Sequence, residues 1–249
     1  MSYFIQEYSY SPILINFPSQ KNQDRGNVWK IYDDKNCGTL MIVADGHGKN
    51  GHVFAECITD YFDKLIISNT IKWFDNDNLF FIIEDIFKGI KLDLINKFGY
   101  LEGGSTLSLA IIRNDKDIWV ANVGDSEIKL FNIEQQITHT LTENHSPLNI
   151  LEAERILKTH PKAIFEYDTK NKFCSLVPIY KFENNKLIKN IPDSDNVYYK
   201  NKSNDLAAYI YFDERRKISM TRSFGDYYFK EKVGLIDKPF IKKYDYLKK

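Results

Sequence analysis

The feature that most restricts the fold is an apolar run that ends in a glycine-rich turn and is followed by a helical pattern. Residues 40–44 contain no polar side chain, which predicts a strand buried on both faces. The run leads into Asp45-Gly46-His47-Gly48, and from residue 51 onwards apolar side chains recur every three or four positions. We therefore expect a strand whose end holds Asp45 and His47 in fixed positions.

The segments around this turn predict strands and helices in alternation. Residues 28–33 and 39–44 are rich in β-branched and aromatic side chains and flank a polar stretch, which predicts a hairpin. Helical periodicity over residues 51–66 and 79–98 predicts two amphipathic helices after the hairpin.

The second half of the chain is less regular. Residues 105–113, 117–123 and 127–133 predict a meander of three strands. A short helix is predicted after Ser146, which is placed to cap it. Residues 158–217 are rich in Asn, Lys and Asp and show little periodicity, so we expect a long surface excursion there.

Charge and cysteine usage limit the function classes. The 249 residues contain 34 Lys and Arg and 34 Asp and Glu, so no overall positive field attracts nucleic acid or an anionic membrane. The three scattered cysteines suggest neither disulfides nor a zinc site. We expect a single domain over residues 1–249, monomeric, soluble and intracellular, in the cytoplasm or nucleus, without nucleic-acid or membrane partners.

Three aspartates are candidates for binding a hard divalent cation. Asp45 follows the apolar strand, Asp125 lies in the turn Gly124-Asp125-Ser126, and Asp24 precedes the first predicted strand. If the two β blocks pack together, Asp45 and Asp125 meet in an acidic cleft, and Mg²⁺ or Mn²⁺ would relieve their repulsion. The alternative is that each aspartate belongs to an ordinary turn or polar loop, because Asp and Gly favour turns for conformational reasons alone.

Seven short segments across residues 22–226 form a set of motifs. The segments are Asn22-Gln23-Asp24, Asp45-Gly46-His47-Gly48, Gly104-Ser105-Thr106, Ala121-Asn122-Val123-Gly124-Asp125-Ser126, Leu141-Thr142-Glu143-Asn144-His145-Ser146-Pro147, Glu154-Arg155-Ile156 and Ser219-Met220-Thr221-Arg222-Ser223-Phe224-Gly225-Asp226. Together, and in this order, they resemble the motifs of the type 2C metal-dependent protein serine/threonine phosphatases.

The resemblance implies a fold and a reaction. The fold is α+β, a four-layer αββα sandwich in which two stacked antiparallel sheets are flanked by helix pairs. The reaction is the hydrolysis of phosphoserine and phosphothreonine in a phosphorylated protein substrate by metal-activated water. By the same resemblance Asp45 bridges two Mg²⁺ or Mn²⁺ ions, and the Gly46 carbonyl binds one of them. Asp24 supports that ion, Asp125 lies where the family places a third, weaker metal, and His47 is the general acid.

The sequence also departs from the family pattern. Two late aspartates, one in an Asp-Gly pair and one in an Asp-Asn pair, are absent, so we expect the C-terminal part of the family fold to be missing. Their absence favours the loss of one of the two ions. The usual phosphate-binding arginine aligns near Ser19, which leaves Lys21 and Arg25 as candidates, although solvated loop charges are the simpler interpretation. Residues 158–217 exceed the family's flap, and we expect a flap or insertion there.

Three functional hypotheses remain open on the sequence. The first is an active metal-dependent phosphatase, possessing Asp45, His47 and Asp125 but impaired by the missing aspartates. The second is a pseudophosphatase that binds phosphoproteins or regulates a partner without catalysis. A third, a sandwich that only binds other proteins, leaves Asp45-Gly46-His47-Gly48 unexplained.

Overall fold

The computed structural model describes residues 5–7, 22–33, 35–68, 70–74, 79–113, 117–170, 177–184, 186–193, 196–199, 206–213 and 216–245. The chain forms two compact units. Unit 1 comprises Met1–Glu143, Ser223–Gly225 and Asp237–Lys249, and unit 2 comprises Asn144–Arg222 and Asp226–Ile236. That residues 1–249 act as one domain stays a prediction.

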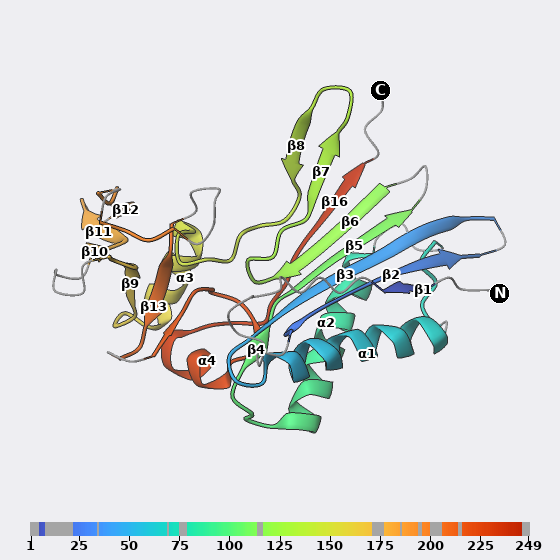
Figure 1. The fold of residues 1–249 in the computed structure, drawn as a ribbon, viewed down its shortest axis with the longest axis horizontal. Coiled ribbons are helices and arrows are strands. Elements are labelled where there is room, and N and C mark those ends of the chain that lie inside the picture. Colours follow the sequence, from blue (N-terminus) through green and yellow to red (C-terminus); the bar gives the residue numbers. More distant parts are fainter. Residues whose placement is uncertain are drawn as a thin grey trace. The chain divides into compact units, whose positions relative to one another are not determined.

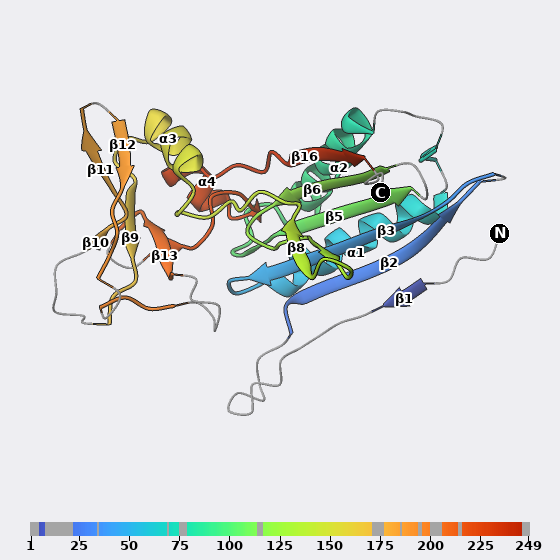
Figure 2. The same ribbon diagram turned by 90° about the horizontal axis from the view of Figure 1, so that it is seen from above.

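Unit 1 is built on an antiparallel sheet in which eight strands are described. Strands β1-β2-β3-β5-β6-β16 lie side by side in that order (Figure 2). Strand β4 pairs with β3 and β15. Two helices, α1 and α2, cover one face (Figure 1). The elements of unit 1 are β1 Ile5–Glu7, β2 Asp24–Tyr32, β3 Cys37–His47, α1 Gly51–Ser68, α2 Phe80–Phe98, β4 Gly104–Ser105, β5 Leu107–Arg113, β6 Asp117–Val123, β7 Lys129–Asn132, β8 Ile137–Thr140, β15 Phe224–Gly225 and β16 Phe240–Asp245.

The predicted hairpin is confirmed, but its burial differs from the prediction. Strands β2 and β3 pair antiparallel over nine positions, from Asp24 opposite Asp45 to Tyr32 opposite Cys37. Burial alternates along β3, so the apolar run is not buried on both faces, and Val43 is 51% exposed. The reason is that α1 and α2 cover only the face of β3 that carries Leu40, Ile42 and Ala44.

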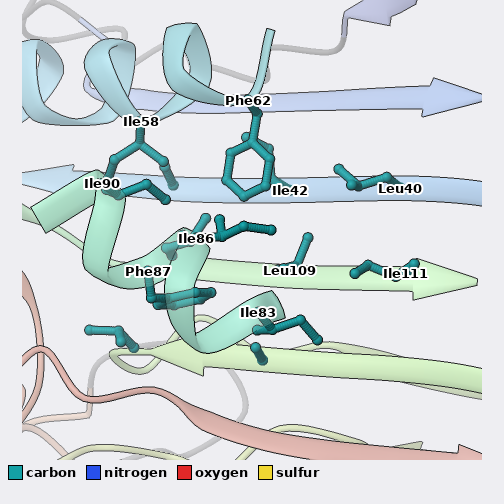
Figure 3. Close-up of a cluster of buried hydrophobic side chains, with 14 of the residues drawn as sticks. Leu40, Ile42, Ile58, Phe62, Ile83, Ile86, Phe87, Ile90, Leu109 and Ile111 are labelled. Carbon is teal, nitrogen blue, oxygen red and sulfur yellow. The ribbon is translucent and has the colours of Figure 1, made fainter. Parts of the chain in front are cut away.

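The predicted helices are confirmed and form the main core with the sheet. Figure 3 shows the side chains of α1 and α2 directed at apolar residues of β3 and β5. These side chains are almost inaccessible to water, and burying each one stabilises the unit by about 1.5–3 kcal/mol. The labelled core residues are Leu40, Ile42, Ile58, Phe62, Ile83, Ile86, Phe87, Ile90, Leu109 and Ile111.

The predicted three-strand meander is wrong at its third strand. Strands β5 and β6 pair as expected, but β7 pairs with β8 in a separate two-stranded sheet. The strand beside β6 is instead β16, which follows more than a hundred residues later and was not predicted. A smaller apolar cluster around Ala110, Val120 and Leu141 lies away from the helix-covered core.

Unit 2 contains a four-stranded sheet in the order β10-β9-β13-β14 and a separate hairpin of β11 and β12. Its core includes Ile156, Phe165, Ile210 and Met220. The elements are α3 Ile150–Thr159, β9 Ile164–Tyr167, β10 Val177–Pro178, β11 Tyr180–Glu183, β12 Lys186–Lys189, β13 Ala208–Tyr211, β14 Lys217–Ile218 and α4 Tyr227–Val233.

Two predictions for unit 2 need correction. The helix does not begin at Ser146: its N-cap is Asn149, whose side chain accepts a hydrogen bond from the Leu151 N–H. Residues 158–217 are not only a surface excursion, because much of this segment forms β9 to β14 around the core of unit 2. Scattered apolar residues in short strands carry too little periodicity to be recognised in a sequence rich in Asn and Lys.

The structure supports the α+β class with antiparallel sheets. Unit 1 contains one such sheet with a helix pair on one face, whereas the four-layer sandwich and the missing C-terminal part stay predictions. In the described ranges, no helix is long and apolar enough to cross a membrane.

Candidate functional site

The three predicted aspartates come together at one end of the unit 1 sheet. Asp24, at the start of β2, lies opposite Asp45, near the end of β3, in the strand register. Partial burial and the charges of Asp24 and Asp125 raise the pKa of Asp45 to about 6, with a contribution from a hydrogen bond to Asp24. The nearby charge of His47 lowers the pKa of Asp45 and thus opposes these effects. The Asp45 carboxyl group therefore interacts electrostatically with those of Asp24 on β2 and Asp125 in the turn after β6.

Hydrogen bonds to the Asp45 N–H and to the Asp45 carbonyl hold the backbone of this residue on both sides. The Asp45 N–H donates to Thr106 Oγ1 at 3.0 Å. The Asp45 carbonyl accepts from the Thr106 N–H at 2.9 Å and from Ser105 Oγ at 3.2 Å. Residues 104–106 were one of the seven motifs and had no predicted role. In the structure, Ser105 and Thr106 hold the Asp45 backbone in place.

Gly46 lies where a side chain cannot fit. Its N–H donates to the Gln23 carbonyl at 3.2 Å. A Cβ at this position would lie 2.4 Å from the Gly51 carbonyl oxygen and 2.5 Å from the Gln23 carbonyl oxygen. Only glycine allows β3 to approach both the start of α1 and the segment before β2 this closely.

Gln23 places a further oxygen beside this turn. Its Oε1 is buried and, within the part of the chain that the structure describes, has no hydrogen-bond partner. A Cβ at Gly51 would lie 2.4 Å from it, so this oxygen is packed against the start of α1. A buried acceptor without a donor is costly, so a bound cation or water would stabilise this position.

His47 ends β3 beside the motif that supports Asp45. It is half-buried and lies opposite Gly104 in the register of β3 and β4. Asp125 is placed by the turn after β6, where Gly124 adopts φ +107°, a conformation that favours glycine. Ser126 then bonds through its hydroxyl to Thr106, with 2.8 Å between the oxygens.

Of the two candidate phosphate-binding residues, Arg25 lies within the described part of the chain. Arg25 lies opposite Ala44, on the helix-covered face, because successive side chains of a strand alternate. Its guanidinium donates to the carbonyls of Asn22 and Asp24 and lies 3.7 Å from the Glu56 carboxylate. Lys21 lies outside the described residues, so phosphate binding by either residue stays a prediction.

The oxygen atoms at this site are of the types that bind a hard divalent cation. Carboxylates and an amide oxygen are the ligands that Mg²⁺ and Mn²⁺ prefer, and the repulsion at Asp45 is what a cation relieves. In the described ranges, however, no group of three or more His, Cys, Asp and Glu side chains is arranged to hold a metal ion. The aspartates are therefore close enough to interact but do not form a closed ligand set.

A second polar cluster, in unit 2, joins two of the motifs. Glu152 of α3 accepts hydrogen bonds from Arg155 and Arg222. Burial alone raises the pKa of Glu152, but the hydrogen bonds from the two arginines outweigh it and lower the pKa to about 2. Sequence reasoning noted Arg155 and Arg222 within motifs but missed Glu152, since nothing local indicates which carboxylate pairs with them.

Comparison with known proteins gives the family. The model of the family described as Protein phosphatase 2C matches residues 87–248. The chain belongs to the protein phosphatase 2C family. The matched region contains Asp125 and the Glu152 cluster, whereas Asp24, Asp45 and His47 precede it, so their roles rest on the sequence motifs and the geometry of the site.

A relative from rice is named as a protein phosphatase 2C. Probable protein phosphatase 2C 44 of Oryza sativa subsp. japonica is 45% identical over 132 residues, which are 51% of this chain and 38% of the rice protein. The match thus spans well under half the length of that relative.

Two solved structures are similar in fold. A bacterial serine phosphatase aligns with a TM-score of 0.53 at 16% identity, over 98% of this chain and 73% of its own. A sex-determining protein of C. elegans aligns with a TM-score of 0.52 at 15% identity, over 98% of this chain and 48% of its own.

Proposed function

We propose that this protein phosphatase 2C chain is a metal-dependent protein serine/threonine phosphatase that hydrolyses phosphoserine and phosphothreonine in protein substrates. The observation that carries the proposal is the meeting of Asp24, Asp45 and Asp125, which raises the pKa of Asp45 to about 6. Carboxylates held together against their repulsion are typical of sites that bind a cation.

The proposed ligands lie on three segments of unit 1. Asp45 is the central ligand, Asp24 and the Gly46 carbonyl assist it, and Asp125 binds a further, weaker ion. Two Mg²⁺ or Mn²⁺ ions follow from the family resemblance. When bound, the ions would neutralise phosphoryl oxygens and make a water molecule acidic enough to attack phosphorus near neutral pH.

The chain's own residues would hold the cation within reach of the substrate and move the proton. Asp45 keeps part of its surface exposed to solvent at the sheet end, so a phosphoryl group could reach a cation held there. We assign His47 as the general acid that protonates the departing serine or threonine oxygen, because it lies within electrostatic reach of Asp45 and keeps part of its surface exposed.

The test is the hydrolysis of a phosphothreonine peptide with Mn²⁺, with Mg²⁺ and with EDTA. We expect turnover that depends on the cation and is reduced at least tenfold in Asp45→Asn, with weaker Mn²⁺ binding in calorimetry. His47→Ala should lower turnover but not Mn²⁺ affinity. The matched control is Asp60→Asn, an exposed aspartate on α1, which should behave like the wild type. Turnover that is reduced neither by EDTA nor by Asp45→Asn would overturn the proposal.

A further inference from the structure

Thr106 lies between β4 and β5 and is fully buried, with contacts to both segments that carry the candidate ligands. Its hydroxyl accepts a hydrogen bond from the Asp45 N–H at 3.0 Å. Its own N–H donates to the Asp45 carbonyl at 2.9 Å. Thr106 therefore fixes the peptide groups on both sides of the Asp45 Cα, which sets the direction in which the Asp45 side chain leaves the backbone.

The same hydroxyl reaches the turn that carries Asp125. Thr106 Oγ1 and Ser126 Oγ are 2.8 Å apart. Either hydroxyl can donate in this bond, because the threonine oxygen keeps its proton and a second lone pair after it accepts from the Asp45 N–H. The turn is held from its other side by Ser108, whose hydroxyl donates to the Ser126 carbonyl at 2.6 Å. One hydroxyl thus links the backbone of Asp45 to the residue that follows Asp125.

The methyl group of Thr106 makes a third connection. A Cβ at Gly124 would lie 2.5 Å from Thr106 Cγ2, so the glycine backbone packs closely against this methyl. Valine would fill the same space as threonine without forming hydrogen bonds. The hydroxyl is therefore not needed for packing, and both of its hydrogen bonds go to segments that carry candidate ligands.

We propose that Thr106 is a positioning residue that sets the divalent-cation affinity of the site by holding Asp45 and Asp125 in register with each other. This inference rests on the proposed function, in which both aspartates are metal ligands. Residues that orient metal ligands from behind typically contribute tenfold to a hundredfold to metal affinity.

The test compares Thr106→Val, which keeps the shape but removes the hydroxyl, with Thr106→Ser, which keeps the hydroxyl. We expect Thr106→Val to weaken Mn²⁺ binding about tenfold or more in calorimetry, and Thr106→Ser to stay within about threefold of wild type. For Thr106→Val, kcat at low Mn²⁺ should fall and recover as Mn²⁺ is raised, while KM for the phosphopeptide changes little.

The matched control is Thr59→Val. Thr59 is a buried threonine on α1 whose hydroxyl donates to the Ala55 carbonyl, away from the residues of the site. It tests whether the loss of any buried hydroxyl has the same effect. Equal weakening of Mn²⁺ binding by Thr59→Val and Thr106→Val, or by Thr106→Ser and Thr106→Val, would overturn the inference.

A second measurement does not depend on metal or activity. Amide hydrogen exchange at Asp45, followed by NMR without metal, should accelerate in Thr106→Val and not in Thr106→Ser or Thr59→Val, because the Asp45 N–H loses its acceptor. Unchanged exchange would contradict the geometry itself. If the wild type binds no Mn²⁺ and hydrolyses no phosphopeptide, the proposed function fails. If the wild type does both and Thr106→Val matches it, this inference alone fails.

Discussion

Neutralising Asp45 should stabilise the metal-free protein at neutral pH. Its pKa is raised from 3.8 to about 6 by partial burial and by Asp24 and Asp125. At 1.36 kcal/mol per pKa unit, ionising this carboxyl costs about 3 kcal/mol more in the folded than in the unfolded protein. Because part of the Asp45 side chain remains exposed to solvent, screening by water reduces the cost to about 1–2 kcal/mol.

The sign of the pH dependence follows from the raised pKa. Asp45 binds its proton more tightly in the folded state, so its contribution to stability is fully present below pH 3.8 and is lost as the pH rises through about 6. Asparagine does not titrate. The free energy of unfolding of Asp45→Asn should therefore exceed that of the wild type by about 1–2 kcal/mol at neutral pH, and the difference should shrink on acidification.

Urea unfolding in EDTA, followed by circular dichroism across this pH range, measures the difference. Saturating Mn²⁺ should reverse the order of stability, because a ligand at about a hundred times its Kd stabilises the wild type by about 2.7 kcal/mol. The exposed carboxyl variant Asp60→Asn is the control for simple charge removal. If Asp45→Asn is no more stable than the wild type without metal at any pH, the carboxyl groups do not repel one another in the folded protein.

Three further changes test the energetics of the fold. Arg113→Met should lower the free energy of unfolding in urea by up to about 3–5 kcal/mol, because Asp117, which is fully buried with Arg113, then keeps only Lys243, 3.3 Å away, as its charged partner. The pKa of Glu152 is lowered from 4.5 to about 2, so the ionised carboxylate should contribute up to about 3 kcal/mol to the free energy of unfolding above pH 4.5. Acid titration of unfolding should show this contribution fading towards pH 2 in the wild type but not in Glu152→Gln. Gly124→Ala should lower the melting temperature, with a cost of at least about 1 kcal/mol, since φ is +107° and the new Cβ meets Thr106.

Local patterns were sufficient for the elements that face one core. The hairpin of β2 and β3 and the helices α1 and α2 follow from periodicity, which depends only on neighbouring residues. The same reasoning failed where the outcome depends on distant segments. A continuous apolar run cannot show that Val43 lies on the face that α1 and α2 leave uncovered. Nor can it show that β6 pairs with β16 rather than with β7.

For the candidate site as well, the sequence predicted some features and only the structure showed the others. Asp24, Asp45 and Asp125 were identified as candidate ligands from glycine turns, strand ends and motif order, and the family model confirms the family. Phosphate binding by Arg25 stays a prediction, and only the register of β2 with β3 shows that this residue lies on the helix-covered face. Strand alternation predicts which neighbours share a face only after the strand's first residue and partner are known.

The sequence by itself determined the family, the two helices and the residue types available for binding a cation. The tertiary structure decided which of those residues meet. The antiparallel register places Asp24 opposite Asp45, and Thr106 joins Asp45 to the turn of Asp125. Asp45 lies 61 positions before Thr106, and Ser126, to which the Thr106 hydroxyl is hydrogen-bonded, lies 20 positions after it. Hydrogen bonds and charges act over a few ångströms of space, and only the packed sheet brings such distant positions within that range.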